Sequence, residues 1–187
     1  MNNFAMLPNG STVPALGQGT WYLGDSTNTH DREARALRAG VAAGMTLIDT
    51  AEMYGEGKSE RLVGDAIAGI NACEGHLLEE DGSVAKPLDR SKLFLVSKVL
   101  PENAGAPEIF RSCNTTLKNL RTDYLDLYLL HWIEDVPLAE TVRCMEQLVE
   151  EGKIRAWGVS NLDTDEMEEL WSIPGGCHCQ VNQVLYN

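Results

Sequence analysis

The chain has 187 residues, 43% of them hydrophobic and 23% charged, which fits one soluble globular domain over residues 1–187. A net charge of -13 argues against nucleic acid or an anionic membrane as the main partner, because both would repel an acidic surface. The sequence has neither an apolar run of about eighteen residues nor a secretion signal at Met1–Leu7, so we expect a cytoplasmic protein without a transmembrane helix.

The N-terminal segment predicts a β-hairpin, a short strand and then a helix. Apolar residues alternate on both sides of the Asn-Gly pair at positions 9–10, and this pair is a strong hairpin signal. Residues 15–21 read as a strand. Residues 31–43 have helical spacing, and Thr29 or Asp31 is expected near the start of the helix.

From position 45 onward, strands and helices alternate about every 30 residues. The predicted strands cover residues 45–51, 93–99, 124–132, 154–161 and 178–187. The predicted helices cover residues 59–70, 107–120, 138–151 and 164–173. Ser59 is expected to cap the first of these helices, and Pro107 to lie in the first turn of the next. This alternation predicts right-handed βαβ units and a parallel sheet.

Residues 71–91 interrupt the alternation with a long, acidic stretch containing Gly and Pro, so we expect a surface insertion with His76 in solvent. The five cysteines are odd in number and lack framework spacing, which favours reduced thiols. Only Cys177-His178-Cys179 resembles a metal-ligand pair. No second Cys/His pair completes a tetrahedral site, so we predict no metal.

An α/β chain of this kind forms either an open doubly wound sheet or a closed barrel. The GQGTW segment at residues 17–21 is not the G-x-G-x-x-G turn of dinucleotide-binding open sheets. The sequence also lacks a phosphate-binding loop and a G-x-S-x-G elbow. We therefore favour a TIM-type barrel, whose chemistry gathers at the carboxyl ends of the strands.

Ionisable side chains occupy those strand ends. Asp49 ends one predicted strand and Tyr54 follows on its loop, while Lys98 and His131 end the next two strands. Each alone would more often be a loop contact than a catalyst. Four groups of complementary chemistry in the same register favour an active site.

The chemistry of these four residues is coherent. A phenol is a poor acid at neutral pH, and a neighbouring ammonium stabilises the phenolate, so Lys98 would make Tyr54 a usable proton donor. Asp49 would supply the counter-charge that Lys98 needs in a partly buried site. His131 would orient a substrate carbonyl. Because none of these side chains carries a hydride, a cofactor must supply it.

Three further polar residues lie at the end of the predicted strand 154–161 or within the predicted strand 178–187. Their hydroxyl and amide groups are suited to binding a carboxamide such as that of nicotinamide: Ser160, Asn161 and Gln183.

With these residues in place, the sequence resembles the aldo-keto reductase family along nearly its whole length. The segments that carry the resemblance are GQGTW, LIDTAEMYGEGKSERLVGDAI, LVSKV, TDYLDLYLLHW, GKIRAWGVSN and NQVLYN. The segments GQGTWYLGD and LIDTAEMYG resemble those of bacterial members that reduce small aldehydes and ketoaldehydes.

The resemblance implies a (β/α)8 barrel that binds NADPH in an extended form, with NADH as the open alternative. It implies Tyr54 as general acid, Lys98 and Asp49 as its tuning pair, and His131 as carbonyl orienter. The implied nicotinamide-side residues are Thr20, Asp49, Ser160, Asn161 and Gln183. The implied substrate-pocket residues are Trp21 and Trp132.

One departure from the family pattern concerns length. The sequence predicts about six βα units where the barrel has eight, so we expect a C-terminally truncated chain or fragment, whose own activity is in doubt. The missing strands would leave two unpaired edges and favour self-association. The alternative to a carbonyl reductase is a regulatory or interaction module with the same barrel that binds the cofactor as a signal.

Overall fold

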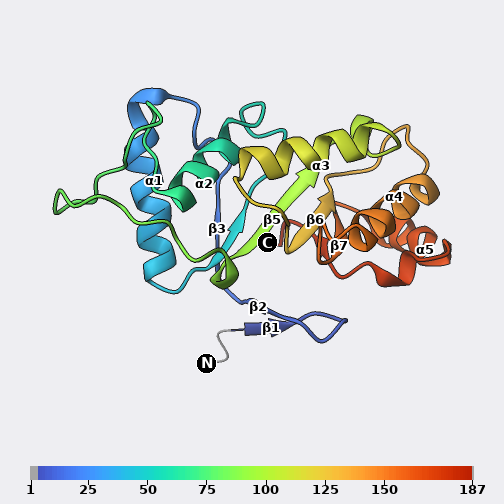
Figure 1. Ribbon diagram of the computed structural model, residues 1–187. Helices are drawn as coiled ribbons and strands as arrows, with labels where there is room; N and C mark the ends of the chain where they lie inside the picture. The colour runs from blue at the N-terminus through green and yellow to red at the C-terminus, as the bar shows by residue number, and fades with distance from the viewer. Residues whose placement is uncertain (1–3, 187) are drawn as a thin grey trace.

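The computed structural model describes residues 4–186, so positions 1–3 and 187 of the expected domain lie outside the described residues. The chain opens with β1 (Phe4–Met6) and β2 (Thr12–Pro14), which pair antiparallel across a turn that contains Gly10 at a φ of 84°. The predicted hairpin is therefore confirmed. It lies below the rest of the molecule in Figure 1.

The main sheet is parallel and its strands pair in chain order, β3-β4-β5-β6-β7-β8. These strands are β3 (Gly17–Gly19), β4 (Leu47–Asp49), β5 (Phe94–Val99), β6 (Leu127–Leu130), β7 (Trp157–Ser160) and β8 (Asn182–Gln183). The six strands form a curled half-barrel, which confirms the predicted barrel type with six of its eight strands.

Five α-helices form an arc around the strands, from α1 on the left of Figure 1 over α3 to α5 on the right. They are α1 (Thr27–Ala42), α2 (Lys58–Ala68), α3 (Glu108–Asn119), α4 (Leu138–Glu150) and α5 (Thr164–Ser172). Short 3-10 helices occur at η1 (Arg90–Lys92), η2 (Pro101–Asn103) and η3 (Gly176–His178).

Three predicted helix starts are wrong. The first helix begins at Thr27 rather than at residue 31, because the Ser26 hydroxyl caps it by accepting from Asn28 N. Gly57, in the left-handed conformation, precedes α2 in place of the expected cap Ser59. Pro107 is the N-cap of α3 and not part of its first turn.

The last predicted strand is much shorter than expected. Gly175 has a φ of 87° and leads into the 3-10 turn η3, so the chain does not extend until after Cys179. Pairing with β7 then begins where Gln180 N donates to Trp157 O, at 3.0 Å. Alternating apolar residues could not show that this turn extends to His178, the first residue of the predicted strand.

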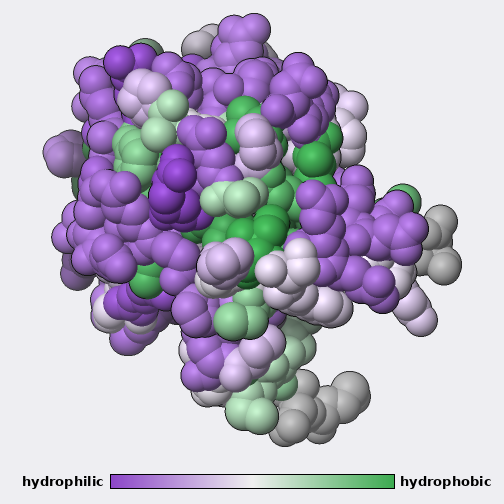
Figure 2. Space-filling model, turned by 90° about the vertical axis from the view of Figure 1, so that its right-hand side faces the viewer, coloured by the Kyte–Doolittle hydropathy of each residue, from purple (hydrophilic) through white to green (hydrophobic). Residues whose placement is uncertain are grey.

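Side chains alternate between two hydrophobic cores. Outward-facing residues such as Leu95 and Val99 pack under the helices in the larger cluster. The smaller cluster lies on the inner face and contains Val96, Leu127, Leu129 and Ala156, with Leu47, Phe94 and Val181 packed against it. Figure 2 views the molecule from the right-hand side of Figure 1 and shows hydrophobic residues at the centre of that face, surrounded by hydrophilic ones.

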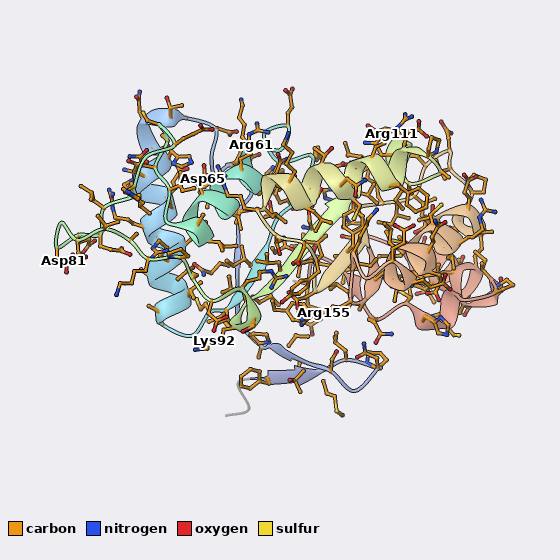
Figure 3. The ribbon with its side chains drawn as sticks, in the orientation of Figure 1. Arg61, Asp65, Asp81, Lys92, Arg111 and Arg155 are labelled. Carbon is orange, nitrogen blue, oxygen red and sulfur yellow. The ribbon has the colours of Figure 1, made fainter. Side chains whose placement is uncertain are left out.

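A cluster of charged residues, which we call the charged clasp, joins the amino ends of β5, β6 and β7 and consists of Arg90, Asp126 and Arg155. The Asp126 carboxylate accepts from Arg90 at 2.7 Å and from Arg155 at 3.1 Å. Both guanidinium groups also lie over the Tyr124 ring, 3.9 and 4.1 Å from its centroid. Figure 3 shows Arg155 near the lower end of the strands. Because barrel chemistry occurs at the opposite end, this clasp serves stability.

The insertion folds over α1 and away from the sheet, and Figure 3 shows Asp81 at its outer tip. Arg38 fastens it, since the guanidinium donates to Glu79 at 2.7 Å and to the carbonyl oxygens of Ala66 and Lys86. His76 is exposed, as predicted. The five cysteines form no disulfide within residues 4–186, and no three possible metal-ligating side chains cluster there. No helix in that same part is long and apolar enough to cross a membrane.

Candidate active site

The alternation of side chains along the strands places the predicted strand-end residues on the inner face of the half-barrel. Successive strand residues face opposite sides, so Asp49, Lys98 and Ser160 follow inward-facing residues two positions earlier on their strands. His131 comes directly after β6 and continues the inner face begun by Leu127 and Leu129. The parallel pairing places all four at the carboxyl end of the half-barrel.

Lys98 is the centre of the site. Its ammonium donates to Asp49 Oδ1 at 2.7 Å, to Thr50 O at 3.0 Å and to the Tyr54 hydroxyl oxygen at 3.2 Å. The side chain is only 2% exposed. Burying an ammonium is costly unless a counter-charge and acceptors surround it, and Asp49 and Thr50 provide both. The structure therefore brings Lys98 into contact with both Asp49 and Tyr54.

Tyr54 stands on a loop held at both ends. Its backbone N–H donates to Ala51 O at 3.0 Å, and Ser59 N donates to Tyr54 O at 3.3 Å. On the same loop, the Glu52 carboxylate accepts from Leu100 N at 2.7 Å, which ties this loop to the one after β5. The phenol ring is thus fixed beside the ammonium of Lys98, which lies 4.9 Å from the ring centroid.

His131 is buried and neutral at pH 7. Burial, together with the positive charge of Lys98, lowers the pKa of its imidazole from 6.5 to about 4, while the negative charge of Asp49 opposes the shift. The ring meets Tyr54 edge-on, with centroids 5.9 Å apart. Its Nδ1 atom is buried without a hydrogen-bond partner among the described residues. A neutral imidazole has one donor and one acceptor nitrogen, so it can hydrogen-bond a ligand without carrying charge.

Polar residues at the ends of β7 and β8 complete the rim. Gln183 Nε2 donates to Asp49 Oδ2 at 2.9 Å, which connects β8 to the central cluster. The Ser160 hydroxyl donates to Gln183 O at 2.8 Å, and Asn161 Nδ2 donates to His131 O at 3.1 Å. The structure thus brings Gln183 against Asp49 and Asn161 against His131, and Ser160 bonds to Gln183, although these residues come from different strands.

Thr20, the remaining predicted cofactor residue, is fully buried. Its hydroxyl donates to Asp49 O at 3.0 Å and accepts from the Ser59 hydroxyl at 2.7 Å. Both bonds are internal, so in this structure Thr20 supports the backbone of Asp49.

The two predicted pocket tryptophans contact different aromatic rings of the site. Trp21 is 60% exposed and stacks on Tyr54, with centroids 5.9 Å apart and ring planes 17° apart. Trp132 packs against His131 at 4.7 Å, and its indole N–H donates to Glu134 at 2.9 Å. Trp21 therefore contacts Tyr54 directly, and Trp132 contacts the neighbouring His131.

Sequence reasoning missed three contributors to the site. Thr50 acts through its backbone oxygen, which carries no side-chain signal. Ser59 was interpreted as a helix cap, whereas its hydroxyl donates to Thr20. Tyr22 stacks on Trp21 at 4.8 Å, and its position next to a predicted pocket residue was the available signal.

A nicotinamide carboxamide fits the chemistry of the rim. A carboxamide both donates and accepts hydrogen bonds, and the hydroxyl of Ser160 and the amides of Asn161 and Gln183 offer both functions. Asn161 and Gln183 are exposed, so a ligand can reach them. The buried, partnerless nitrogen of His131 lies next to this rim through the Asn161 bond to His131 O.

Comparison with known proteins shows matches along nearly the whole chain. A family model described as the Aldo/keto reductase family matches residues 15–187. Methylglyoxal reductase YeaE of Escherichia coli K12 is 49% identical over 176 residues, which are 94% of this chain and 55% of that protein. Glyoxal reductase of Bacillus subtilis is 34% identical over 164 residues, which are 88% of this chain and 51% of that protein.

Solved structures agree with these relatives. An aldo-keto reductase from Klebsiella pneumoniae in complex with NADPH is 47% identical, with a TM-score of 0.85 over 100% of this chain and 59% of that one. An aldo/keto reductase from the same organism, in complex with NADP and acetate, has a TM-score of 0.86. The chain spans about half the length of the curated relatives it matches.

Proposed function

The chain belongs to the aldo/keto reductase family, and we propose that it carries the proton-donating centre of an enzyme that reduces small aldehydes and ketones to alcohols. The observation that carries this proposal is the Lys98 ammonium, which contacts Asp49 at 2.7 Å and the Tyr54 hydroxyl at 3.2 Å. A binding module has no need of a phenol placed against a buried ammonium.

The substrate carbonyl is oriented by two neutral donors. Because the pKa of His131 is lowered to about 4, its imidazole stays uncharged at neutral pH and can hydrogen-bond the carbonyl oxygen. The Tyr54 ring lies next to this imidazole and meets it edge-on, with centroids 5.9 Å apart. Together these groups fix the carbonyl oxygen beside the Tyr54 proton.

Proton transfer then runs from Tyr54 to the carbonyl oxygen. The phenolate left behind lies 3.2 Å from the Lys98 ammonium, which stabilises it electrostatically. Asp49 supplies the counter-charge to the buried Lys98 ammonium, and the Thr50 carbonyl oxygen accepts a second hydrogen bond from it. The roles of these residues follow from the contacts of a single ammonium group.

NADPH, when bound, supplies the hydride that reduces the carbonyl carbon. Ser160, Asn161 and Gln183 would hold its carboxamide. We propose NADPH rather than NADH because the related Klebsiella structures contain NADPH and NADP.

For the substrate we propose small ketoaldehydes, since the relatives are named methylglyoxal reductase and glyoxal reductase. We also propose that the catalytic unit is larger than residues 1–187. The chain covers only 55% and 51% of those two relatives. Intact-mass measurement of the native protein tests this, and a mass near 20.5 kDa would contradict it.

The test of the proposed function is NADPH oxidation with methylglyoxal, comparing the native protein with Tyr54→Phe. Removing the phenol hydroxyl removes the proton donor, so turnover should fall about 100- to 10,000-fold while NADPH fluorescence still reports binding. Tyr186→Phe, which removes a hydroxyl from a side chain 96% exposed, is the matched control and should keep full activity.

Two outcomes would contradict the proposal. Retained turnover in Tyr54→Phe would remove Tyr54 as the acid. Bound NADPH without turnover in either protein would favour the alternative function, a module that binds the cofactor for regulation.

A further inference from the structure

Glu52, an acidic residue of the loop after β4, bonds to the segment of the chain that begins at Lys98. The backbone N–H of Glu52 donates to Lys98 O at 3.3 Å, and the Glu52 carboxylate accepts from Leu100 N at 2.7 Å. Asn103 Nδ2 donates to the same carboxylate oxygen, Oε1, at 3.0 Å. Two residues after Glu52 the loop reaches Tyr54, so the segment that carries the proton donor is joined here to the segment that carries the ammonium.

These bonds continue the parallel pairing of β4 with β5 beyond the end of β4. Thr50 N donates to Val96 O at 2.9 Å. Two residues further along each chain, Glu52 N donates to Lys98 O. In a parallel ladder the next donor, Leu100 N, would bond to the backbone oxygen of Glu52. Here it bonds to the side-chain oxygen of the same residue, so the carboxylate replaces the backbone acceptor where the loop leaves the sheet.

The contact between Tyr54 and Lys98 depends on this attachment. Tyr54 N donates to Ala51 O at 3.0 Å, so the backbone of residues 51–54 forms one tight turn that starts beside β5. The Tyr54 hydroxyl lies 3.2 Å from the ammonium. A shift of this turn away from β5 would lengthen that contact, while Lys98 would remain bound to Asp49 on the paired strand at 2.7 Å.

We propose that Glu52 is a positioning residue that holds the Tyr54 hydroxyl against the Lys98 ammonium and so controls the rate of proton transfer. This inference rests on the proposed carbonyl reduction. In that step the O–H bond of Tyr54 breaks as the O–H bond of the alcohol forms. Lys98 stabilises the resulting phenolate only while the two groups stay in contact. Glu52 acts through the position of Tyr54.

The experiment compares Glu52→Ala with Glu52→Gln in the reduction of methylglyoxal by NADPH. Both bonds to the side chain end on Oε1, so the amide oxygen of glutamine can accept them, and Glu52→Gln should keep kcat within about twofold. Alanine removes the acceptor, so kcat should fall about 10- to 100-fold with little change in either KM. Glu102→Ala, which removes an exposed carboxylate from η2, is the matched control and should keep full activity.

A solvent isotope effect separates positioning from a loss of folded protein. In D2O the Tyr54 hydroxyl carries deuterium, so slower proton transfer raises the ratio of kcat in H2O to kcat in D2O. A smaller folded fraction lowers kcat and leaves this ratio unchanged. We expect a higher ratio in Glu52→Ala and the native ratio in Glu52→Gln. An unchanged ratio in Glu52→Ala, or an equal loss of kcat in the two variants, overturns the proposal.

If the native protein does not reduce methylglyoxal, the proposed function fails, and hydrogen exchange still tests the positioning. Mass spectrometry then follows the backbone amides of residues 50–57 in the native protein and in both Glu52 variants. Faster exchange in Glu52→Ala that is absent from Glu52→Gln supports the positioning. Exchange unchanged in Glu52→Ala, or equally fast in the two variants, overturns it.

Discussion

His131 shows how the surroundings of one residue decide its charge. It follows the buried strand β6, and burial together with the charge of Lys98 lowers its pKa from 6.5 to about 4. The imidazole therefore remains neutral through the range in which a free histidine becomes protonated. Its proposed hydrogen bond to the substrate carbonyl should persist well below neutral pH.

The same shift makes stability depend on pH. Between pH 6.5 and about 4 the unfolded chain binds a proton at position 131 and the folded chain does not, so stability falls as pH falls through this window. The shift corresponds to roughly 3 kcal/mol at one pKa unit per 1.36 kcal/mol. Urea denaturation at neutral and acidic pH should therefore show a smaller acid loss for His131→Asn. His76→Asn, at an exposed loop histidine, is the control, and identical acid losses in native protein and His131→Asn would contradict the shift.

Site residues could be predicted from the sequence where an ionisable side chain directly follows the apolar residues of a strand. Asp49, Lys98 and His131 each follow apolar residues of a strand, and the structure joins the first two at 2.7 Å. The residues that hold these side chains in position were harder to predict. The Thr50 carbonyl has no side-chain signal, and the link between Ser59 and Thr20 joins residues 39 positions apart.

At the scale of elements, Glu60 joins α2 to β5 and α3. It is fully buried, and its carboxylate accepts from the Ser97 hydroxyl at 2.7 Å, the Thr116 hydroxyl at 2.9 Å and Asn119 Nδ2 at 2.9 Å. Burial raises the pKa of this carboxyl, while its three donors oppose the rise. Ser97 precedes Lys98 on β5, so this contact also fixes the strand that carries the ammonium.

Glu60→Ala should destabilise the fold strongly. The substitution leaves two buried hydroxyls and an amide without their acceptor, and each unpaired buried group costs about 1–3 kcal/mol. We expect a loss of about 3 kcal/mol in the free energy of unfolding, measured by urea denaturation. Glu168→Ala on the exposed face of α5 should change it by less than about 0.5 kcal/mol. Equal effects of the two substitutions would show that the buried contacts contribute little.

Elements were predictable from periodicity, and their ends were less so. Alternation on β5 separates the outward Leu95 from the inward Val96, and this two-residue period identified the strand. Helix starts depended on local capping, as at Ser26, where one hydroxyl extends α1 by a turn. Glu60 carried a sequence signal that was overlooked, since it shares the core-facing stripe of α2 with Val63 and Ile67.

At the scale of the whole molecule, the sheet has two unpaired edges within residues 4–186. β3 pairs only with β4, and β8 pairs only with β7. The parallel order was predictable from the alternation of strands and helices, whereas the curl and the inner apolar face depend on how six strands pair in register. An open edge exposes backbone donors and acceptors that can pair with another chain.

The residues after β8 increase this tendency, because Val184, Leu185 and Tyr186 are 51%, 84% and 96% exposed. We therefore predict that the 187-residue chain on its own associates as its concentration rises, measured by size-exclusion chromatography with light scattering. Leu185→Lys adds a charge beside the edge strand and should shift the equilibrium toward the monomer. Trp171→Lys places the same charge on α5, at a side chain 57% exposed, and should leave association unchanged. A monomer at every concentration, or equal effects of the two lysines, would show that association does not proceed through this edge.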